Sequence, residues 1–169
     1  MSRFDFLSSP RAAGELGRLA HYRVLRLLGE GGMGMVFLAE DSLLSRPVAL
    51  KVIRPEIADT PGIAQRFMRE ARATAAIKHD HIVTIYQVGQ ENGIPFLAME
   101  YLKGMSLDGW LDRGHRPSME LVLRIGREIA AGLSAAHRHS LIHRDIKPAN
   151  IWLEAPAGQI GRASCRERV

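Results

Sequence analysis

A run of glycines between two strand-like segments constrains the fold of this chain more than any other feature. The run Gly29-Glu30-Gly31-Gly32-Met33-Gly34 separates Tyr22–Leu28 from Met35–Glu40, and apolar residues roughly alternate with polar ones in both flanking segments. Glycine lets a tight turn approach an anion closely with its backbone N–H groups. A dinucleotide-binding fold requires a helix after such glycines, whereas a strand follows here. The run therefore predicts a β-hairpin whose turn binds phosphate, with a plain glycine hairpin as the alternative.

Three further strands and one helix are predicted downstream. Val48–Ile53 is an apolar strand, and Ile82–Val88 and Pro95–Met99 form a second hairpin around an Asn-Gly turn. Apolar residues at helical spacing predict a helix over about 61–78. The first part of the chain is therefore predicted to be a five-stranded antiparallel sheet with one helix.

The pattern becomes helical beyond Tyr101. Ser106–Arg113 predicts a short helix, and Ser118 is expected to cap a longer one that runs to about His139 with one apolar stripe. Residues 1–20 mix Ser, Pro, Gly and Arg without sustained periodicity and are predicted to be a flexible leader. Strands followed by helices indicate an α+β fold.

Composition and charge argue against several functional classes. The formal net charge is +5, but basic residues are interleaved with acidic ones, so no nucleic-acid partner is expected. No apolar run reaches membrane-spanning length, and the sole cysteine, Cys165, fits a reducing compartment such as the cytoplasm. His139 and His143 have the i, i+4 spacing of a zinc site, but no further ligands accompany them, so zinc is not expected.

Lys51 ends the apolar run of the third strand, where an unpaired buried ammonium is costly. Glu70, on the predicted helix, is a candidate partner. The alternative, favoured for either residue taken alone, is a surface lysine beside an exposed helical glutamate.

The segment His143-Arg144-Asp145-Ile146-Lys147-Pro148-Ala149-Asn150 follows the long helix. With the glycine run, the Val48–Lys51 strand and Glu70, it gives the motif order of the eukaryotic-type protein kinase family, and its wording is most similar to bacterial serine/threonine protein kinases. The resemblance covers about Tyr22–Glu154. It implies a two-lobed kinase fold with a complete N-lobe (21–99), a hinge (100–104) and only the start of the helical C-lobe (105–158), together a partial kinase domain over 21–158.

The resemblance implies roles for residues on the phosphate side of an ATP site. Gly29, Gly31 and Gly34 would shape the lid over the phosphates. Lys51 would hold the α- and β-phosphates, and Glu70 would orient Lys51.

Other residues would bind the adenine. Val36 and Ala49 would cover one face of the ring, and Met99 would stand at the back of the pocket. The hinge Glu100-Tyr101-Leu102 would offer backbone groups of Glu100 and Leu102 to the adenine edge. Trp152 replaces a usually smaller residue beneath the adenine, where it would make partial contact; core packing is the alternative.

The catalytic residues implied by the resemblance lie in the His143–Asn150 segment. Asp145 would accept or orient the proton of the substrate hydroxyl, Lys147 would balance charge on the transferred phosphoryl group, and Asn150 would ligate Mg²⁺. His143 would anchor the loop, and Arg144 would pair with an activation-loop phosphate. The expected activity is transfer of the ATP γ-phosphoryl group to Ser or Thr of protein substrates; the alternative is a non-catalytic nucleotide-binding pseudokinase or regulatory module.

Residues 159–169 contain no D-F-G motif and do not resemble a strand. Ile160–Val169 resembles the translation of a sequencing adapter that begins AGATCGGAAGAGC, so 159–169 are interpreted as a non-native tail, with a genuine unusual C-terminus as the alternative. The 169-residue chain is then expected to be inactive and poorly soluble, with an uncovered apolar face on the long helix. Any membrane attachment is expected to lie in regions beyond it.

Overall fold

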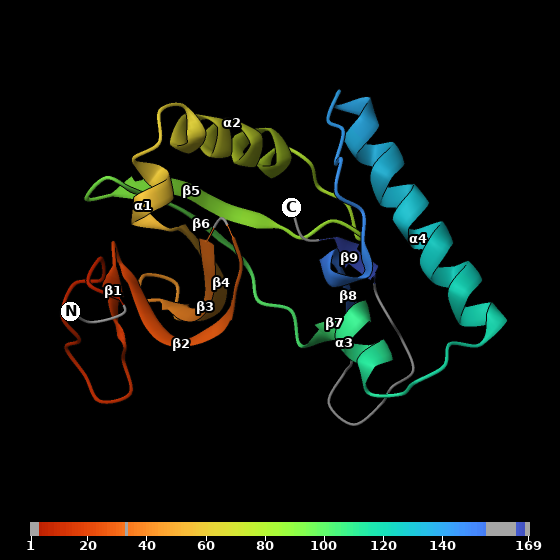
Figure 1. The fold of residues 1–169 in the computed structure, drawn as a ribbon, viewed down its shortest axis with the longest axis horizontal. Helices are drawn as coiled ribbons and strands as arrows, with labels where there is room; N and C mark the ends of the chain where they lie inside the picture. Colours follow the sequence, from red (N-terminus) through yellow and green to blue (C-terminus); the bar gives the residue numbers. More distant parts are fainter. Residues whose placement is uncertain (1–3, 33, 155–164, 168–169) are drawn as a thin grey trace. The chain divides into compact units, whose positions relative to one another are not determined.

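The computed structural model describes residues 4–32, 34–154 and 165–167, the last three as backbone only (Figure 1). The chain forms two compact units. The first comprises Met1–Arg72 and Ile85–Tyr101, and the second comprises Ala73–Thr84 and Leu102–Val169.

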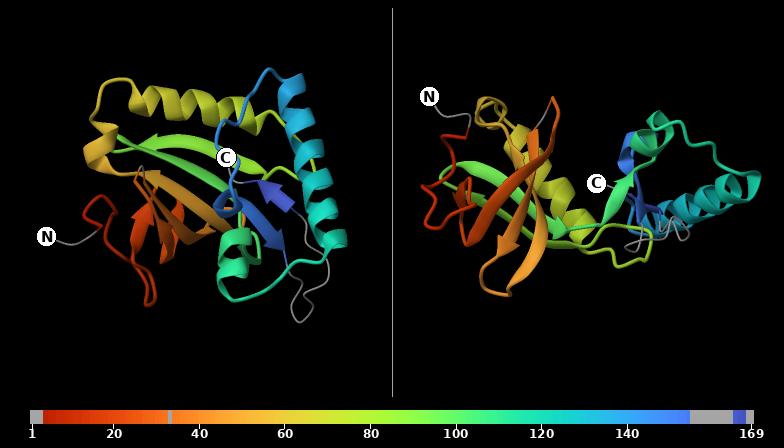
Figure 2. Two further views of the ribbon diagram at one scale, coloured as in Figure 1. Left: turned by 45° about the vertical axis from the view of Figure 1, so that its right-hand side comes forward. Right: turned by 90° about the horizontal axis from the view of Figure 1, so that it is seen from below.

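The first unit is built on a six-stranded antiparallel sheet in the order β1-β2-β3-β4-β6-β5. Its strands are β1 Gly17–Leu19, β2 Tyr22–Glu30, β3 Gly34–Asp41, β4 Arg46–Ile53, β5 Ile85–Glu91 and β6 Ile94–Glu100. A short helix α1, Pro55–Ala58, precedes α2, Ile63–Ala75; α2 lies beside the sheet at β5 (Figures 1 and 2). The five predicted strands and the helix are thus confirmed, with α2 shorter than predicted.

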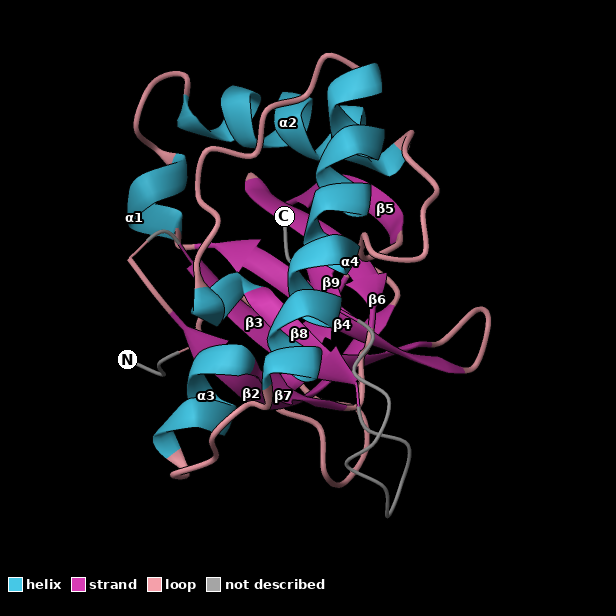
Figure 3. Cartoon of the chain, turned by 90° about the vertical axis from the view of Figure 1, so that its right-hand side faces the viewer, coloured by secondary structure: helices cyan, strands magenta, loops and turns pink. Residues whose placement is uncertain are grey.

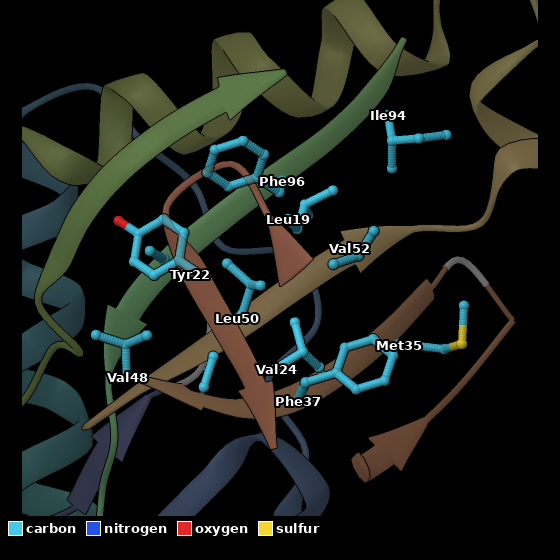
Figure 4. Packing of buried hydrophobic residues seen from close by; sticks show 12 residues of the cluster. Leu19, Tyr22, Val24, Met35, Phe37, Val48, Leu50, Val52, Ile94 and Phe96 are labelled. Atoms are coloured by element: carbon cyan, nitrogen blue, oxygen red, sulfur yellow. The ribbon is translucent and has the colours of Figure 1, made fainter. Parts of the chain in front are cut away.

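Alternate residues of neighbouring strands form the core of this unit, because successive side chains of a strand point to opposite faces. Phe37 of β3, Leu50 and Val52 of β4 and Phe96 of β6 are all buried in one cluster (Figure 4). Tyr22 belongs to the same cluster, and its hydroxyl donates a 2.6 Å hydrogen bond to Gln87 Oε1. Apolar burial of about 25 cal/mol per Å² makes such a cluster the main source of stability.

The segment before Tyr22, predicted to be a flexible leader, contains regular structure. Strand β1 pairs with β2, and Phe4, Phe6 and Leu7 pack against the core cluster. The structure differs from the prediction here because a three-residue strand is too short to show a period in the sequence.

Residues 73–84 belong to the second unit, although the predicted N-lobe included them. Ile77 and Ile82 are buried against Ala135 and Ala136 of the long helix. The fourth predicted strand consequently begins at Ile85 rather than Ile82.

The second unit combines helices with a small antiparallel sheet in the order β7-β8-β9. Its elements are β7 Gly104–Ser106, α3 Leu107–Asp112, α4 Met119–Arg138, the 3₁₀ turn η1 Pro148–Asn150, β8 Ile151–Glu154 and β9 Cys165–Glu167. The predicted cap is confirmed, because Ser118 Oγ accepts a 3.2 Å hydrogen bond from the backbone N–H of Leu121. Helix α4 runs past the small sheet (Figure 3). No helix in the described part of the chain is long and apolar enough to cross a membrane.

Strand β9 differs from the prediction that the tail forms no strand. Its backbone pairs antiparallel with β8, with Trp152 opposite Arg166. Three residues against an existing strand need no sequence pattern of their own, because the partner supplies the hydrogen bonds. Residues 155–164 and 168–169, which hold most of the predicted non-native tail, lie outside the described residues.

Candidate functional site

One face of the sheet in the first unit carries the predicted adenine-side residues and the predicted phosphate-binding lysine. Val48, Leu50 and Val52 of β4 point into the core, so strand alternation turns Ala49 and Lys51 to the opposite face.

The register extends this face onto the neighbouring strands. Val36 pairs with Lys51, and Met99 pairs with Ala49, which groups four predicted site residues. Leu97, directly opposite Lys51 on β6, belongs to the same face and was missed by the sequence reasoning. The signal that could have identified Leu97 is its position two residues before Met99 on the same strand, which puts both side chains on one face. A half-buried ammonium on an otherwise apolar face favours an anionic ligand or side chain beside it.

The glycine turn closes the β2–β3 hairpin at one end of this face. The Gly31 N–H donates a 2.9 Å hydrogen bond to the Gly34 carbonyl. A Cβ on Gly34 would collide with the Val52 carbonyl oxygen, whereas Cβ atoms on Gly29 and Gly31 would meet nothing within 4 Å. Gly34 is therefore required by packing, while Gly29 and Gly31 leave room above the turn for a ligand.

Glu70 lies on α2 and forms an ion pair with Arg66, with 3.5 Å between Oε1 and Nε. Both side chains are largely exposed, at 63% and 69%, so this pair is weak. Orientation of Lys51 by Glu70 stays a prediction.

The predicted hinge coincides with a division in the structure. Glu100 ends β6 opposite Val48, and the boundary between the two units falls between Tyr101 and Leu102. The backbone contacts that Glu100 and Leu102 would make with adenine stay predictions.

The second unit brings together the predicted catalytic residues. Lys147 Nζ lies 2.8 Å from Asp145 Oδ2, and Asn150 Nδ2 donates to the same oxygen at 3.0 Å and to the Asp145 carbonyl at 2.8 Å. The Asp145 N–H donates a 3.2 Å hydrogen bond to His143 Nδ1. Turn η1 places Asn150 for these contacts, because its first residue, Pro148, has a backbone φ suited to a helical turn. Asp145 is therefore held through both its carboxylate and its backbone.

These contacts set the ionisation of Asp145. The hydrogen bond from Lys147, followed by that from Asn150, lowers the pKa of Asp145 below its usual value. Both contacts stabilise the charged form. The carboxylate is thus a weak base at neutral pH, better suited to orienting a hydroxyl than to removing its proton in the ground state.

Arg144 has a left-handed backbone, with φ of 62°. Such a conformation costs a bulky residue about 1–3 kcal/mol and persists where its surroundings impose it. No pattern in the sequence predicted this conformation. Its position directly before Asp145 supports a functional role for this loop.

Trp152 lies on β8 between Ile151 and Leu153, which are buried in a cluster with Trp110 and Ile125. Strand alternation therefore turns Trp152 away from that cluster. Its contact with adenine stays a prediction.

Comparison with known proteins gives a consistent result. A family model described as protein kinase domain matches residues 22–161. Serine/threonine-protein kinase PrkC of Bacillus subtilis is 38% identical over 133 residues, which make up 79% of this chain and 20% of that protein. PknA of Corynebacterium glutamicum is 38% identical over an alignment of 160 positions, which covers 92% of this chain and 34% of that protein.

Solved structures agree with the sequence matches. A crystal structure of the PknI kinase domain of Mycobacterium tuberculosis matches with a TM-score of 0.75 and 30% identity, over 94% of this chain and 62% of that chain. The chain thus spans between a fifth and a third of these two curated relatives.

Proposed function

Because the chain belongs to the protein kinase domain family, we propose that the protein containing it transfers the γ-phosphoryl group of ATP to Ser or Thr hydroxyls of other proteins. Relatives named serine/threonine-protein kinases support this reaction class. The observation that carries the proposal is the Asp145 cluster, in which Lys147 and Asn150 both contact one carboxylate oxygen. The proposed partners are substrate proteins that bear Ser or Thr, and the kinase domain that acts on them is proposed to be cytoplasmic.

The cluster supports an assignment of roles. The substrate oxygen attacks the γ-phosphorus as the bond from phosphorus to the ADP oxygen breaks, and the hydroxyl proton passes to Asp145 as the new bond forms. The low pKa of Asp145 makes this a late transfer. Lys147, 2.8 Å from Asp145, is placed to neutralise charge on the transferred group.

The donor set of the same cluster fits Mg²⁺. Because Asn150 Nδ2 donates two hydrogen bonds to Asp145, the orientation of the amide is defined and its Oδ1 remains to ligate a cation. Mg²⁺ prefers oxygen ligands, and it would neutralise the phosphates of ATP. Asn150 is therefore the proposed metal ligand among the described residues.

The sheet face of the first unit is the proposed ATP side. Val36, which is half-buried, offers apolar surface to the adenine, and the buried Ala49 and Met99 lie on the same face of the sheet. Lys51 offers a cation to the phosphates. Glycine at positions 29 and 31 keeps space open for phosphate oxygens.

The test is the substitution Asp145→Asn in the longer protein, with transfer of labelled phosphate from ATP to a Ser- and Thr-containing protein as the readout. We expect kcat to fall about 10²- to 10⁴-fold, the usual contribution of a positioned acid–base group. The matched control is Asp112→Asn, at an exposed position at the end of α3. Equal activity of the Asp145→Asn variant and the wild type would contradict the proposal.

For the 169-residue chain by itself we propose nucleotide binding without phosphoryl transfer, because its sequence contains no D-F-G motif to supply the second Mg²⁺ ligand. Transfer by this chain alone would overturn that statement. Nucleotide binding without transfer by the longer protein would instead identify a pseudokinase.

A further inference from the structure

The segment Phe4–Ser8, here called the strap, lies against the core side of β3. The Phe4 ring meets Phe37 edge-on with centroids 5.3 Å apart, and the Phe6 ring meets Phe37 at 6.3 Å. The two strap rings also meet each other edge-on at 6.4 Å. These three rings form one aromatic cluster, with geometries that aromatic pairs favour.

The strap is held at its far end by specific packing. Ser8 N–H donates to the Arg18 carbonyl at 2.8 Å, and Arg18 N–H donates to the Ser8 carbonyl at 2.9 Å. A Cβ on Gly17 would lie 2.7 Å from the Ser8 carbonyl oxygen and 2.8 Å from Leu7 Cβ. The absence of a side chain at Gly17 is therefore what lets the strap approach β1 so closely.

The strap borders an open cavity. This cavity of about 660 Å³ is lined by Phe6 and Leu7 of the strap, by Met35 and Ile94 of the sheet, and by residues 54–56. The aromatic contacts with Phe37 attach the strap to β3, and removal of one ring should loosen it.

Phe37 connects the strap to the glycine turn. Strand β3 begins at Gly34, so Phe37 is three residues beyond the end of the turn. Met35 and Phe37 point to the core, as Figure 4 shows. Val36 points to the opposite face, beside Lys51. Cβ atoms on Gly29 and Gly31 would meet nothing within 4 Å, and the ion pair of Glu30 with Arg54 at 3.3 Å joins two exposed side chains and is weak. The turn therefore depends mainly on the strands that carry it.

We propose that the strap positions the glycine turn for the phosphate groups of a nucleoside triphosphate, by holding the first residues of β3 in place. This inference rests on the proposed function and adds a structural element that influences the same site. Phe6 is a positioning residue, because it acts through Phe37 on Gly34.

The test uses Phe6→Ala in the 169-residue chain, with the affinities for ATP and for adenosine measured separately by calorimetry. We expect the affinity for ATP to fall about 3- to 10-fold, within the range of coupling effects from distant substitutions. The affinity for adenosine should change less than about 2-fold, because adenosine has no phosphates for the turn to hold. A purely structural role would reduce both affinities together.

Two further variants complete the comparison. Phe6→Leu keeps an apolar side chain and should restore most of the affinity for ATP. Leu43→Ala removes an apolar side chain that is 73% exposed in the turn beyond β3, and should leave both affinities unchanged. If Phe6→Ala loses its far-ultraviolet circular dichroism, the comparison is made with Phe6→Leu, whose loss of ATP affinity should be smaller but again exceed that for adenosine.

The outcomes separate this inference from the proposed function. Unchanged binding of ATP, or equal losses for ATP and adenosine, would overturn the role of the strap. If the wild-type chain binds neither ligand, the proposed nucleotide site is wrong. Hydrogen exchange of the backbone amides of residues 34–37 then tests separately whether the strap holds the start of β3. Faster exchange in Phe6→Ala supports the mechanical link from strap to turn, and unchanged exchange refutes it.

Discussion

At the scale of single residues, the neighbours of Lys51 and Asp145 determine what each charged side chain can bind. Asp145 is exposed, yet Lys147 and Asn150 keep its pKa low. Lys51 is half-buried on an apolar face, opposite Leu97 and Val36. Each position suits a group that must meet an oppositely charged or polar ligand.

Replacement of Lys51 by Met should weaken binding of ATP by the 169-residue chain. A hydrogen bond between charged partners contributes about 1.5–3 kcal/mol, which corresponds to roughly a 10- to 150-fold loss of affinity. Calorimetric titration with ATP is the measurement. The control Lys78→Met, at an exposed position between α2 and β5, should bind as the wild type does. If Lys51→Met binds ATP with the affinity of the wild type, Lys51 does not contribute to the ATP site.

Glu15 is a second carboxylate of the described residues whose pKa is lowered by its neighbours. Its side chain accepts hydrogen bonds from Arg18 at 3.0 Å, from Arg23 at 2.7 Å and from the Arg11 backbone at 2.9 Å. The bonds from Arg18, then the Arg11 backbone, then Arg23 lower the pKa of Glu15 to about 2 from 4.5. The network ties the segment before β1 to β1 and β2.

The stability contributed by Glu15 should therefore depend on pH. Because its folded pKa is lowered, the contribution is fully present above about pH 4.5 and is lost as the pH falls toward 2. Chemical unfolding of wild type and Glu15→Gln across this range is the measurement; their difference in unfolding free energy should be largest near neutral pH and vanish near pH 2. The exposed Glu56→Gln serves as the control. A pH-independent difference would contradict the assignment.

At the scale of elements, helix α4 contains two glycines whose surroundings differ. A Cβ on Gly132 would lie 3.2 Å from the His81 carbonyl oxygen, whereas one on Gly126 would meet nothing within 4 Å. Ile82, which follows His81, is buried against Ala135 and Ala136, so the carbonyl cannot easily move away. Gly132 is therefore a packing requirement, and Gly126 is only a cost in helix propensity.

The substitutions Gly126→Ala and Gly132→Ala form a matched pair on one helix. Gly126→Ala should raise the free energy of unfolding by up to about 1 kcal/mol, the difference in propensity between glycine and alanine. Gly132→Ala should be less stable than Gly126→Ala by at least about 1 kcal/mol, because overpacking offsets that gain. Urea unfolding followed by circular dichroism measures both. Equal stabilities of the two variants would mean that the backbone at His81 shifts to accommodate the added methyl group.

At the scale of the molecule, α4 presents large apolar side chains to solvent. Met119, Val122 and Leu123 are exposed at 72%, 47% and 66%. Ile142 and Ile146, beyond the helix, are also exposed. Exposed apolar groups of this size on a single unit promote self-association.

Replacement of Leu123 by Lys should therefore reduce aggregation of the 169-residue chain without lowering its melting temperature by more than a few degrees, because the side chain is largely exposed in the folded state. Light scattering during storage and thermal melting are the measurements. The control Leu121→Lys, at a position that packs on the Trp110 cluster, should lower the melting temperature. Unchanged scattering in Leu123→Lys would show that this face does not drive association.

The sequence alone was enough for features that depend on neighbours in the chain. Alternating apolar residues predicted β2 and β3, an apolar run predicted β4, and the Asn-Gly turn predicted the hairpin that includes β6. The glycine run predicted the first hairpin, and Ser118 predicted the start of α4. These signals are local, since period and capping act over a few residues. The segment His143–Asn150 likewise predicted that Asp145, Lys147 and Asn150, the residues proposed to be catalytic, lie together in one loop.

Only the tertiary structure decided the features that depend on residues distant in sequence. Strand β1 and β9 form because longer strands offer them free edges. Residues 73–84 join the second unit because Ile77 and Ile82 are buried against α4. The strap packs against Phe37, and the His81 carbonyl oxygen lies too close to Gly132 for a side chain at that position. In each case the deciding force is packing or hydrogen bonding with a partner that no local pattern specifies, which is why the sequence could not predict it.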